Sequence, residues 1–215
     1  MKVAFLSESV ADEAALKILT DALLGKPTET IPHAGLRHRG WPSIPKLLPA
    51  VLRQLHYHTE AEGLVLVVDS NCTPVHSPEH ESGDTHPTTC RLCQLRRIAA
   101  NTLRNVRPRP HAPPLQLALG LAVPAIEAWL LCGKDPHVTE AAWINALESG
   151  SSNQPYSKAS LKQRLYGTSR PSLALEIETM TRAAHRLAQN LGLLENLFPN
   201  GFGSFARDLR SWTAP

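Results

Sequence analysis

The sequence lacks a long apolar segment and a glycine-rich phosphate loop. Nowhere in the chain are about 18 apolar residues uninterrupted, the length that a membrane-spanning helix requires. The apolar run after Met1 is too short for the apolar region of a signal peptide. Neither a G-x-G-x-x-G pattern nor a Walker-A pattern occurs, which argues against a metabolic enzyme that holds a small phosphorylated substrate in such a loop. We therefore expect a cytoplasmic protein without membrane contact.

Cysteine is also scarce, with four residues in a chain of 215. Because no export signal is recognised, we expect these residues to be thiols or metal ligands and not disulfides. Hydrophobic residues make up 42% of the chain, which is typical of a globular protein and excludes a disordered one. A chain of this length can bury a sizeable core, and we expect one domain with a helical extension.

Acidic residues are absent between Thr85 and Ile126, although the net charge of the whole chain is only +3. The same segment carries six arginines, Arg91, Arg96, Arg97, Arg104, Arg107 and Arg109. Such a cationic segment is typical of a surface that binds a polyanion, and we predict nucleic acid as the partner. Arg91, Arg97 and Arg104 are the expected contacts. The alternative is an ordinary solvated helix face.

Short apolar runs separated by helical patterns predict a parallel sheet. The run from Leu64 to Val68 has five apolar residues, three of them valine, and predicts a strand buried on both faces. Further strands are predicted over Lys2 to Leu6 and Leu115 to Val123, with a weaker one over Glu29 to Pro32. Helical patterns lie between the strands, so we predict an α/β, Rossmann-like fold with a mostly parallel sheet flanked by helices.

The C-terminal third follows a helical pattern throughout. Four helices are expected there, over Val138 to Leu147, Ser157 to Leu165, Pro171 to Leu191 and Ser204 to Trp212. We therefore divide the chain into an α/β core over residues 1–135 and an α-helical C-terminal extension over residues 136–215, packed on the core as a layer. Residues 71–93 form an irregular insertion in the core that is a possible zinc-binding segment.

Three acidic residues follow three of the predicted strands. Glu8 comes after the first strand, Asp69 ends the central strand and Glu127 lies just past the late strand. In an open parallel sheet the carboxyl ends of the strands share one edge, where ligands bind. Grouped carboxylates suit Mg²⁺ (or Mn²⁺) and should repel each other unless a cation or a shared proton is present. Taken singly, Asp69 could cap the next turn and Glu8 could be exposed near a helix N-terminus.

Thiol and imidazole groups gather between the central strand and the arginine-rich helix. The pattern is Cys-x3-His followed by Cys-x2-Cys, formed by Cys72, His76, Cys90 and Cys93. These ligand types can close a tetrahedron around Zn²⁺, and a helix N-terminus lowers the pKa of a thiol placed there. His80 and His86 are substitutes for His76 or are exposed to solvent. The alternative is that the cysteines are buried free thiols.

Several short motifs resemble those of TOPRIM-like proteins. Ser7-Glu8-Ser9 after a strand, Asp12-Glu13 opening a helix and Asp69-x-Asn71 ending a strand are similar to the TOPRIM pattern. More narrowly, the chain resembles the small TOPRIM-like proteins of bacterial defence loci, often encoded beside an ABC- or AAA-type ATPase. That group's pattern is also matched by Arg37-His38-Arg39-Gly40, by Ala125-Ile126-Glu127-Ala128-Trp129-Leu130, and by Lys158 with Lys162. Two departures are Ser9 in place of a glycine and Asn71 in place of a second aspartate.

The resemblance implies roles for these residues. Glu8 would be the general acid or base, Asp69 the main Mg²⁺ ligand, and Asn71 and Glu127 assisting groups. An amide oxygen at Asn71 can ligate Mg²⁺, but it brings no charge, so metal affinity should fall. Further residues are expected to hold phosphate groups electrostatically: Arg37, Arg39 and Lys158.

We therefore carry two hypotheses from different classes. The first is a Mg²⁺-dependent TOPRIM-like nuclease that hydrolyses the phosphodiester bonds of DNA or RNA, as the effector of an antiphage (antiviral) defence system. The second is a non-catalytic TOPRIM-like subunit that binds an ATPase partner or nucleic acid, which the departures at Ser9 and Asn71 favour.

Overall fold

The computed structural model describes residues 1–32, 40–82, 88–109, 113–149 and 154–213. Within these ranges the chain forms an α/β fold around a parallel four-stranded sheet, consistent with the predicted Rossmann-like class. The strands are β1 (Lys2–Leu6), β2 (Glu29–Thr30), β3 (Gly63–Asp69) and β4 (Gln116–Ala122). All four agree with the predicted strands to within a few residues.

The sheet has the order β2-β1-β3-β4, and every neighbouring pair is parallel. The central strand β3 is buried along its whole length, as a strand covered on both faces must be. It also extends beyond β1, because Leu66 is the last residue paired with that strand at Leu6, whereas Asp69 still pairs with Ala122 of β4. The carboxyl end of β3 therefore projects past β1 toward the helices beyond the sheet.

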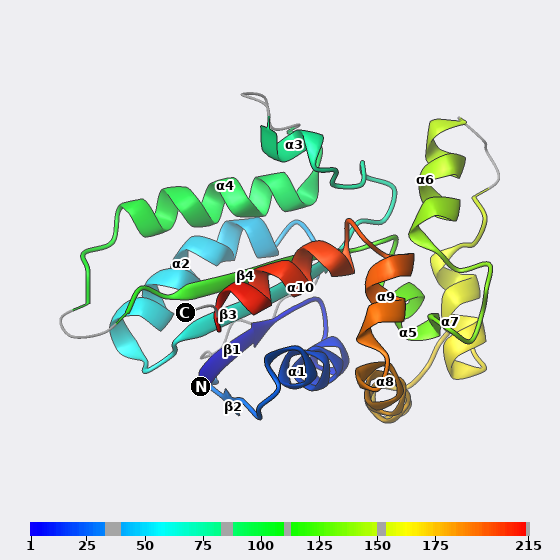
Figure 1. Ribbon diagram of the computed structural model, residues 1–215, viewed down its shortest axis with the longest axis horizontal. Coiled ribbons are helices and arrows are strands. Elements are labelled where there is room, and N and C mark those ends of the chain that lie inside the picture. Colours follow the sequence, from blue (N-terminus) through cyan, green and yellow to red (C-terminus); the bar gives the residue numbers. More distant parts are fainter. Residues whose placement is uncertain (33–39, 83–87, 110–112, 150–153, 214–215) are drawn as a thin grey trace.

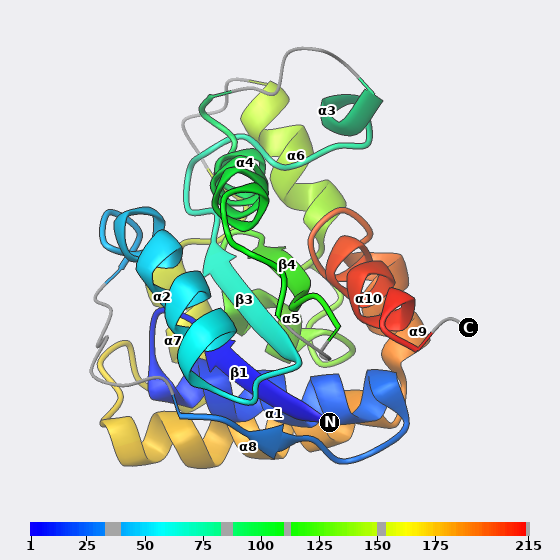
Figure 2. The same cartoon turned by 90° about the vertical axis from the view of Figure 1, so that its left-hand side faces the viewer.

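Two helices cover each face of the sheet. Figure 2 shows α2 (Ile44–His58) and α4 (Arg91–Arg104) on one side, and α1 (Val10–Leu24) and α10 (Phe202–Ser211) on the other. A glycine allows α10 to approach closely, since a side chain at Gly120 of β4 would lie 2.9 Å from Val67 and 3.2 Å from Phe205.

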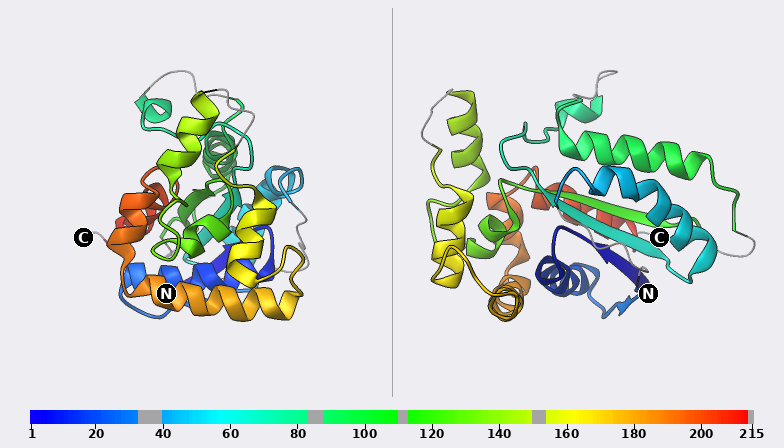
Figure 3. Two further views of the ribbon diagram at one scale, coloured as in Figure 1. Left: turned by 90° about the vertical axis from the view of Figure 1, so that its right-hand side faces the viewer. Right: turned by 180° about the vertical axis from the view of Figure 1, so that it is seen from behind.

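The C-terminal third is helical, but it holds five described helices where four were predicted, because a short helix follows the one expected over Pro171 to Leu191. They are α6 (Glu140–Glu148), α7 (Lys158–Tyr166), α8 (Leu173–Ala188), α9 (Leu191–Leu197) and α10, and α8 packs along α1. Figures 1 and 3 show α6, α7 and the short α5 (Ile126–Leu131) beyond the carboxyl edge of the sheet. One unpredicted helical turn, α3 (Glu79–Ser82), interrupts the segment after β3. None of the described helices is long and apolar enough to cross a membrane.

Candidate active site and metal centre

Glu8, Asp69 and Glu127 line one cavity at the carboxyl edge of the sheet, as their positions after three strands predicted. The cavity has a volume of about 190 Å³ and is also lined by a fourth acid, Asp12 of α1. Parallel topology explains the convergence, because β1, β3 and β4 all end at this edge. Asp12 reaches it because Ser9 caps α1, accepting a hydrogen bond from the Asp12 N–H at 3.1 Å.

Asp69 is the most firmly held of the four acids. Its Oδ1 accepts a hydrogen bond from the backbone N–H of Ile126 at 3.0 Å, and its Oδ2 accepts one from the ammonium group of Lys158. Its own backbone N–H donates to Glu8 Oε1 at 3.3 Å. The side chain is almost completely buried, so these contacts fix both the position and the orientation of the carboxylate.

Two lysines one turn apart on α7 bring positive charge to the acids. Lys158 pairs with Asp69, while the Lys162 ammonium group lies 3.7 Å from Glu127 Oε1 and 3.0 Å from Glu176 Oε1. Residues four apart on a helix lie on the same face, which directs both ammonium groups into the cavity. The expectation that clustered carboxylates require a compensating cation is met here by lysine.

Burial and repulsion raise the pKa of three acids of the cavity, Glu8, Asp12 and Glu127. Burial raises the pKa of Glu8 and of Glu127, and the negative charge of Asp69 raises both further. Burial also raises the pKa of Asp12 well above its ordinary value, with added repulsion from Asp69 and Glu127. For Lys158, burial lowers the pKa, but the charge and hydrogen bond of Asp69 outweigh it and raise the pKa overall. The cavity therefore favours bound protons and bound cations.

Other predicted site residues lie elsewhere. Asn71 is not among the residues that line the cavity, because the chain turns at this point with a left-handed φ of 51° and the Asn71 N–H donates to the Pro124 carbonyl. Arg37 and Arg39 fall outside the described residues. Sequence reasoning also left out Glu176, which no motif marks and which α8 brings to the cavity from a distant segment.

The predicted nucleic-acid contacts on α4 separate into two kinds. Arg97 and Arg104 are exposed, seven residues apart on one face of the helix. Arg91 is buried instead, and its guanidinium group donates to the backbone carbonyl of Asp69 at 2.5 Å and lies 4.7 Å from the ring centre of Trp41. Arg91 is therefore not available to nucleic acid, because it belongs to the first turn of α4, which faces the end of β3.

Four side chains in the segment before and at the start of α4 could bind a metal ion such as zinc. They are His76, His80, Cys90 and Cys93, whose ligand atoms all lie within 4.8 Å of one another. Nδ1 of His76 lies 3.6 Å from the sulfur of Cys90 and 3.4 Å from that of Cys93, and Nδ1 of His80 lies 3.7 Å from the Cys93 sulfur. Cys90 caps α4 and Cys93 is in its first turn.

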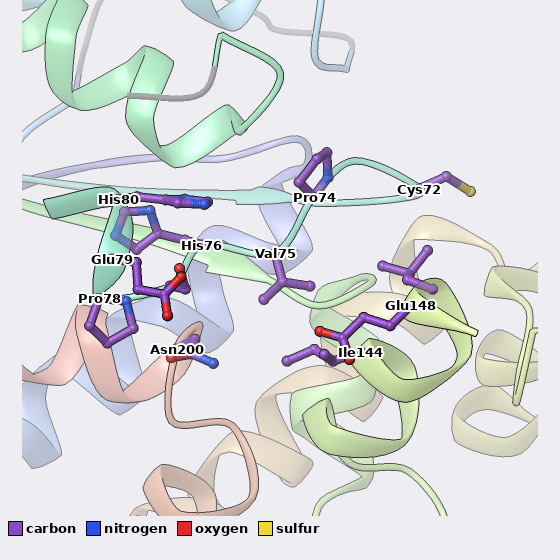
Figure 4. Close-up of a pocket in the computed structure, with 12 residues that line it drawn as sticks. Cys72, Pro74, Val75, His76, Pro78, Glu79, His80, Ile144, Glu148 and Asn200 are labelled. Atoms are coloured by element: carbon purple, nitrogen blue, oxygen red, sulfur yellow. The ribbon is translucent and has the colours of Figure 1, made fainter. Parts of the chain in front are cut away.

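The ligand set differs from the predicted one at one position. Cys72 is exposed and lies outside the cluster, and His80 takes its place. Figure 4 shows the Cys72 sulfur directed away from His76 and His80, across a cavity of about 700 Å³. The reason is local: Cys72 lies only three residues after the end of β3, whereas His80 is on α3, the helical turn near the start of α4. The His-x3-His spacing was the signal for this ligand. His86 lies outside the described residues.

Comparisons with known proteins give no family to which the cavity or the cluster can be assigned. The chain matches no family model, no curated protein and no solved structure. The TOPRIM-like resemblance therefore stays a prediction, and the function has to be inferred from the geometry of the two sites.

Proposed function

We propose that the protein is a Mg²⁺-dependent, TOPRIM-like hydrolase that cleaves phosphodiester bonds in DNA or RNA. The observation that carries this proposal is the convergence of Glu8, Asp69 and Glu127, which are far apart in sequence, on one cavity that also holds Lys158 and Lys162. Carboxylates for a cation and ammonium groups for phosphate oxygens are the two kinds of group that phosphoryl transfer needs.

The residues of the cavity fit Mg²⁺. Carboxylate oxygens are the hard ligands that this ion prefers. Within the described part of the chain, Glu127 lines the cavity and its Oε2 is buried without a hydrogen-bond partner, so this residue holds an unsatisfied acceptor. Asp69 and Glu127, assisted by Glu8, would hold the ion. When bound, it would polarise a phosphoryl oxygen and lower the pKa of a bound water molecule.

The protein's own side chains would divide the remaining work. Glu8 is the candidate general acid or base, because its raised pKa brings proton exchange closer to neutral pH. Lys158 and Lys162 would stabilise negative charge on the phosphate, and Arg97 and Arg104 on α4 would hold the nucleic-acid backbone farther from the cavity.

Cleavage assays on plasmid DNA and on tRNA with Mg²⁺ or Mn²⁺ test this function. We expect Asp69→Asn and Glu8→Gln to lower the cleavage rate at least about a hundredfold, because each removes a charge needed at the reacting phosphate. The matched control is Glu178→Gln, an exposed acid on α8 that pairs with Arg182 outside the cavity. Equal rates for the wild type, Asp69→Asn and Glu8→Gln, with unchanged melting temperatures, would refute the assignment.

The second metal site is proposed to be structural zinc. With bonds of about 2.1 Å to nitrogen and about 2.3 Å to sulfur, tetrahedral zinc separates neighbouring nitrogen and sulfur ligands by about 3.6 Å. The sulfur–nitrogen distances of 3.4, 3.6 and 3.7 Å between the cluster residues agree with this value. Four protein ligands leave no open position, so this ion would stabilise the fold and would not take part in catalysis.

A non-catalytic TOPRIM-like subunit is the second candidate. Two observations favour it: the Lys158 ammonium group is bonded to Asp69 where a metal ion would bind, and Asn71 is not part of the cavity lining. In this case the protein binds nucleic acid or an ABC- or AAA-type ATPase partner through the cavity and the exposed arginines of α4. Purified protein that binds a duplex, alone or with such an ATPase, but never cleaves it with Mg²⁺ or Mn²⁺ would favour this candidate. The role as an antiphage effector is proposed for the first candidate only.

A further inference from the structure

The metal cluster and the acidic cavity are joined by one side chain. Arg91 stands between Cys90 and Cys93 in the first turn of α4, so a metal ion on the two sulfurs would fix the backbone on both sides of it. The side chain itself extends away from the cluster to the carboxyl end of β3. It is buried, and Trp41 lies against its guanidinium group with a distance of 4.7 Å to the ring centre.

The end of β3 has a specific need for this arginine. Since Leu66 is the last residue of β3 paired with β1, the backbone groups of Asp69 on that side have no strand partner. The Asp69 N–H donates to Glu8 Oε1 at 3.3 Å, and the Asp69 carbonyl accepts from Arg91 at 2.5 Å. A buried carbonyl without a hydrogen-bond partner destabilises the folded state, so both contacts hold the strand end in place.

We propose that Arg91 is a positioning residue through which a zinc ion on His76, His80, Cys90 and Cys93 holds Asp69 in the acidic cavity. Zinc closes the first turn of α4, the closed turn directs Arg91 at the Asp69 carbonyl, and this bond holds the end of β3 from which the Asp69 carboxylate extends. The role of Asp69 as a ligand of a divalent cation in the cavity rests on the proposed function. The contact through which the cluster holds the end of β3 does not depend on it.

Amide hydrogen exchange of the peptide that covers residues 66–72, read by mass spectrometry, tests the link. In the zinc-loaded protein, Arg91→Met should keep one zinc ion per chain yet raise the exchange rate of this peptide about tenfold or more, since a hydrogen bond from a charged group is lost. Cys93→Ser should lose the zinc and raise exchange by a similar factor. The double variant should exchange no faster than the faster single variant, because both changes break the same path.

Two controls make the result decisive. Arg97→Met removes an exposed arginine from the same helix and should leave both zinc content and exchange unchanged. If Arg91→Met does not fold, Arg91→Lys and the wild-type protein stripped of zinc by a chelator give the same comparison. The proposal is overturned if the protein binds no zinc, if zinc removal or Arg91→Met leaves exchange at residues 66–72 unchanged, or if the two effects multiply in the double variant.

Binding of Mn²⁺, measured by titration, separates this inference from the proposed function. We expect Arg91→Met and Cys93→Ser to weaken Mn²⁺ binding by similar factors of about ten, while Arg97→Met binds as the wild type. Wild-type protein that binds no Mn²⁺ would refute the proposed function, and the exchange measurement would still decide whether Arg91 links the two sites.

Discussion

The acidic cavity and the His/Cys cluster are both connected to Asp69 at the carboxyl end of β3, the cavity through its carboxylate and the cluster through Arg91, but they differ in chemistry. The cavity presents oxygens and ammonium groups from segments as far apart as Glu8 and Glu176. The cluster presents nitrogen and sulfur from His76 to Cys93. One site depends on the topology of the whole domain, and the other on a single segment and the first turn of α4.

Because of this difference in ligands, the acidic cavity can exchange protons and cations, whereas the His/Cys cluster would keep one metal ion. Burial and, to a smaller extent, like charges raise the pKa of Glu8, Asp12 and Glu127, and such a site gains stability by taking up protons or cations. The cluster has as many ligands as a tetrahedral ion accepts, so a bound ion would be closed off from solvent ligands. We therefore expect exchangeable ions in the first site and a permanent ion in the second.

The largest effect should come from removing a cluster ligand. Cys93→Ser should lower the free energy of unfolding by several kcal/mol, since binding of structural zinc contributes directly to folding. Cys72→Ser is the matched control and should have almost no effect, because that thiol is exposed outside the cluster. Thermal melts with measured zinc content test both. A loss of zinc in Cys72→Ser would show that Cys72 is a ligand after all, as the sequence predicted.

A smaller effect of opposite sign is expected in the cavity. Asp12 has a folded-state pKa well above its ordinary value of 3.8, so its protonated form is favoured by folding. The stability that this protonation contributes is complete below the ordinary pKa of 3.8. It is lost as the pH rises from there through the folded-state pKa. Asp12→Asn should therefore raise the free energy of unfolding at pH 7, since an amide carries no charge at this position. Melts from pH 4 to pH 8 should show a flatter curve for the variant, whereas Glu178→Gln should follow the wild type.

Mg²⁺ should reverse part of this pH dependence. Protons and cations compete for the same carboxylates, so millimolar Mg²⁺ should raise the melting temperature more at pH 8 than at pH 5. Asp69→Asn should abolish the difference. A shift of equal size at both pH values, or one that persists in Asp69→Asn, would place the Mg²⁺ outside the cavity.

The smallest effect concerns the exposed arginines, which belong to neither site. Replacing Arg97 and Arg104 by glutamine should weaken nucleic-acid binding and lower the slope of log K against log salt concentration by about two, one for each phosphate that is no longer neutralised. Arg182→Gln on α8 is the control. An unchanged slope in the double variant would assign this face of α4 to ordinary solvated surface.

Much of the fold followed from local patterns. Apolar runs at Lys2 to Leu6, Leu64 to Val68 and Leu115 to Val123 became β1, β3 and β4, since a short β-branched run buried on both faces has few alternatives. The convergence of Glu8, Asp69 and Glu127 on one cavity could also be predicted, because the carboxyl ends of parallel strands lie at one edge of the sheet. The helical turn α3 could not be predicted, as four residues carry no periodic signal.

By itself the sequence determined which residues could do chemistry: acids after strands, thiols at a helix start, arginines along a helix. Only the tertiary structure decided how they are used. His80 and not Cys72 completes the cluster, and Arg91 faces Asp69 and not solvent. The physical reason is that a ligand set or a hydrogen bond depends on side-chain directions, which are set when α3, α4 and β3 pack together and not by spacing along the chain.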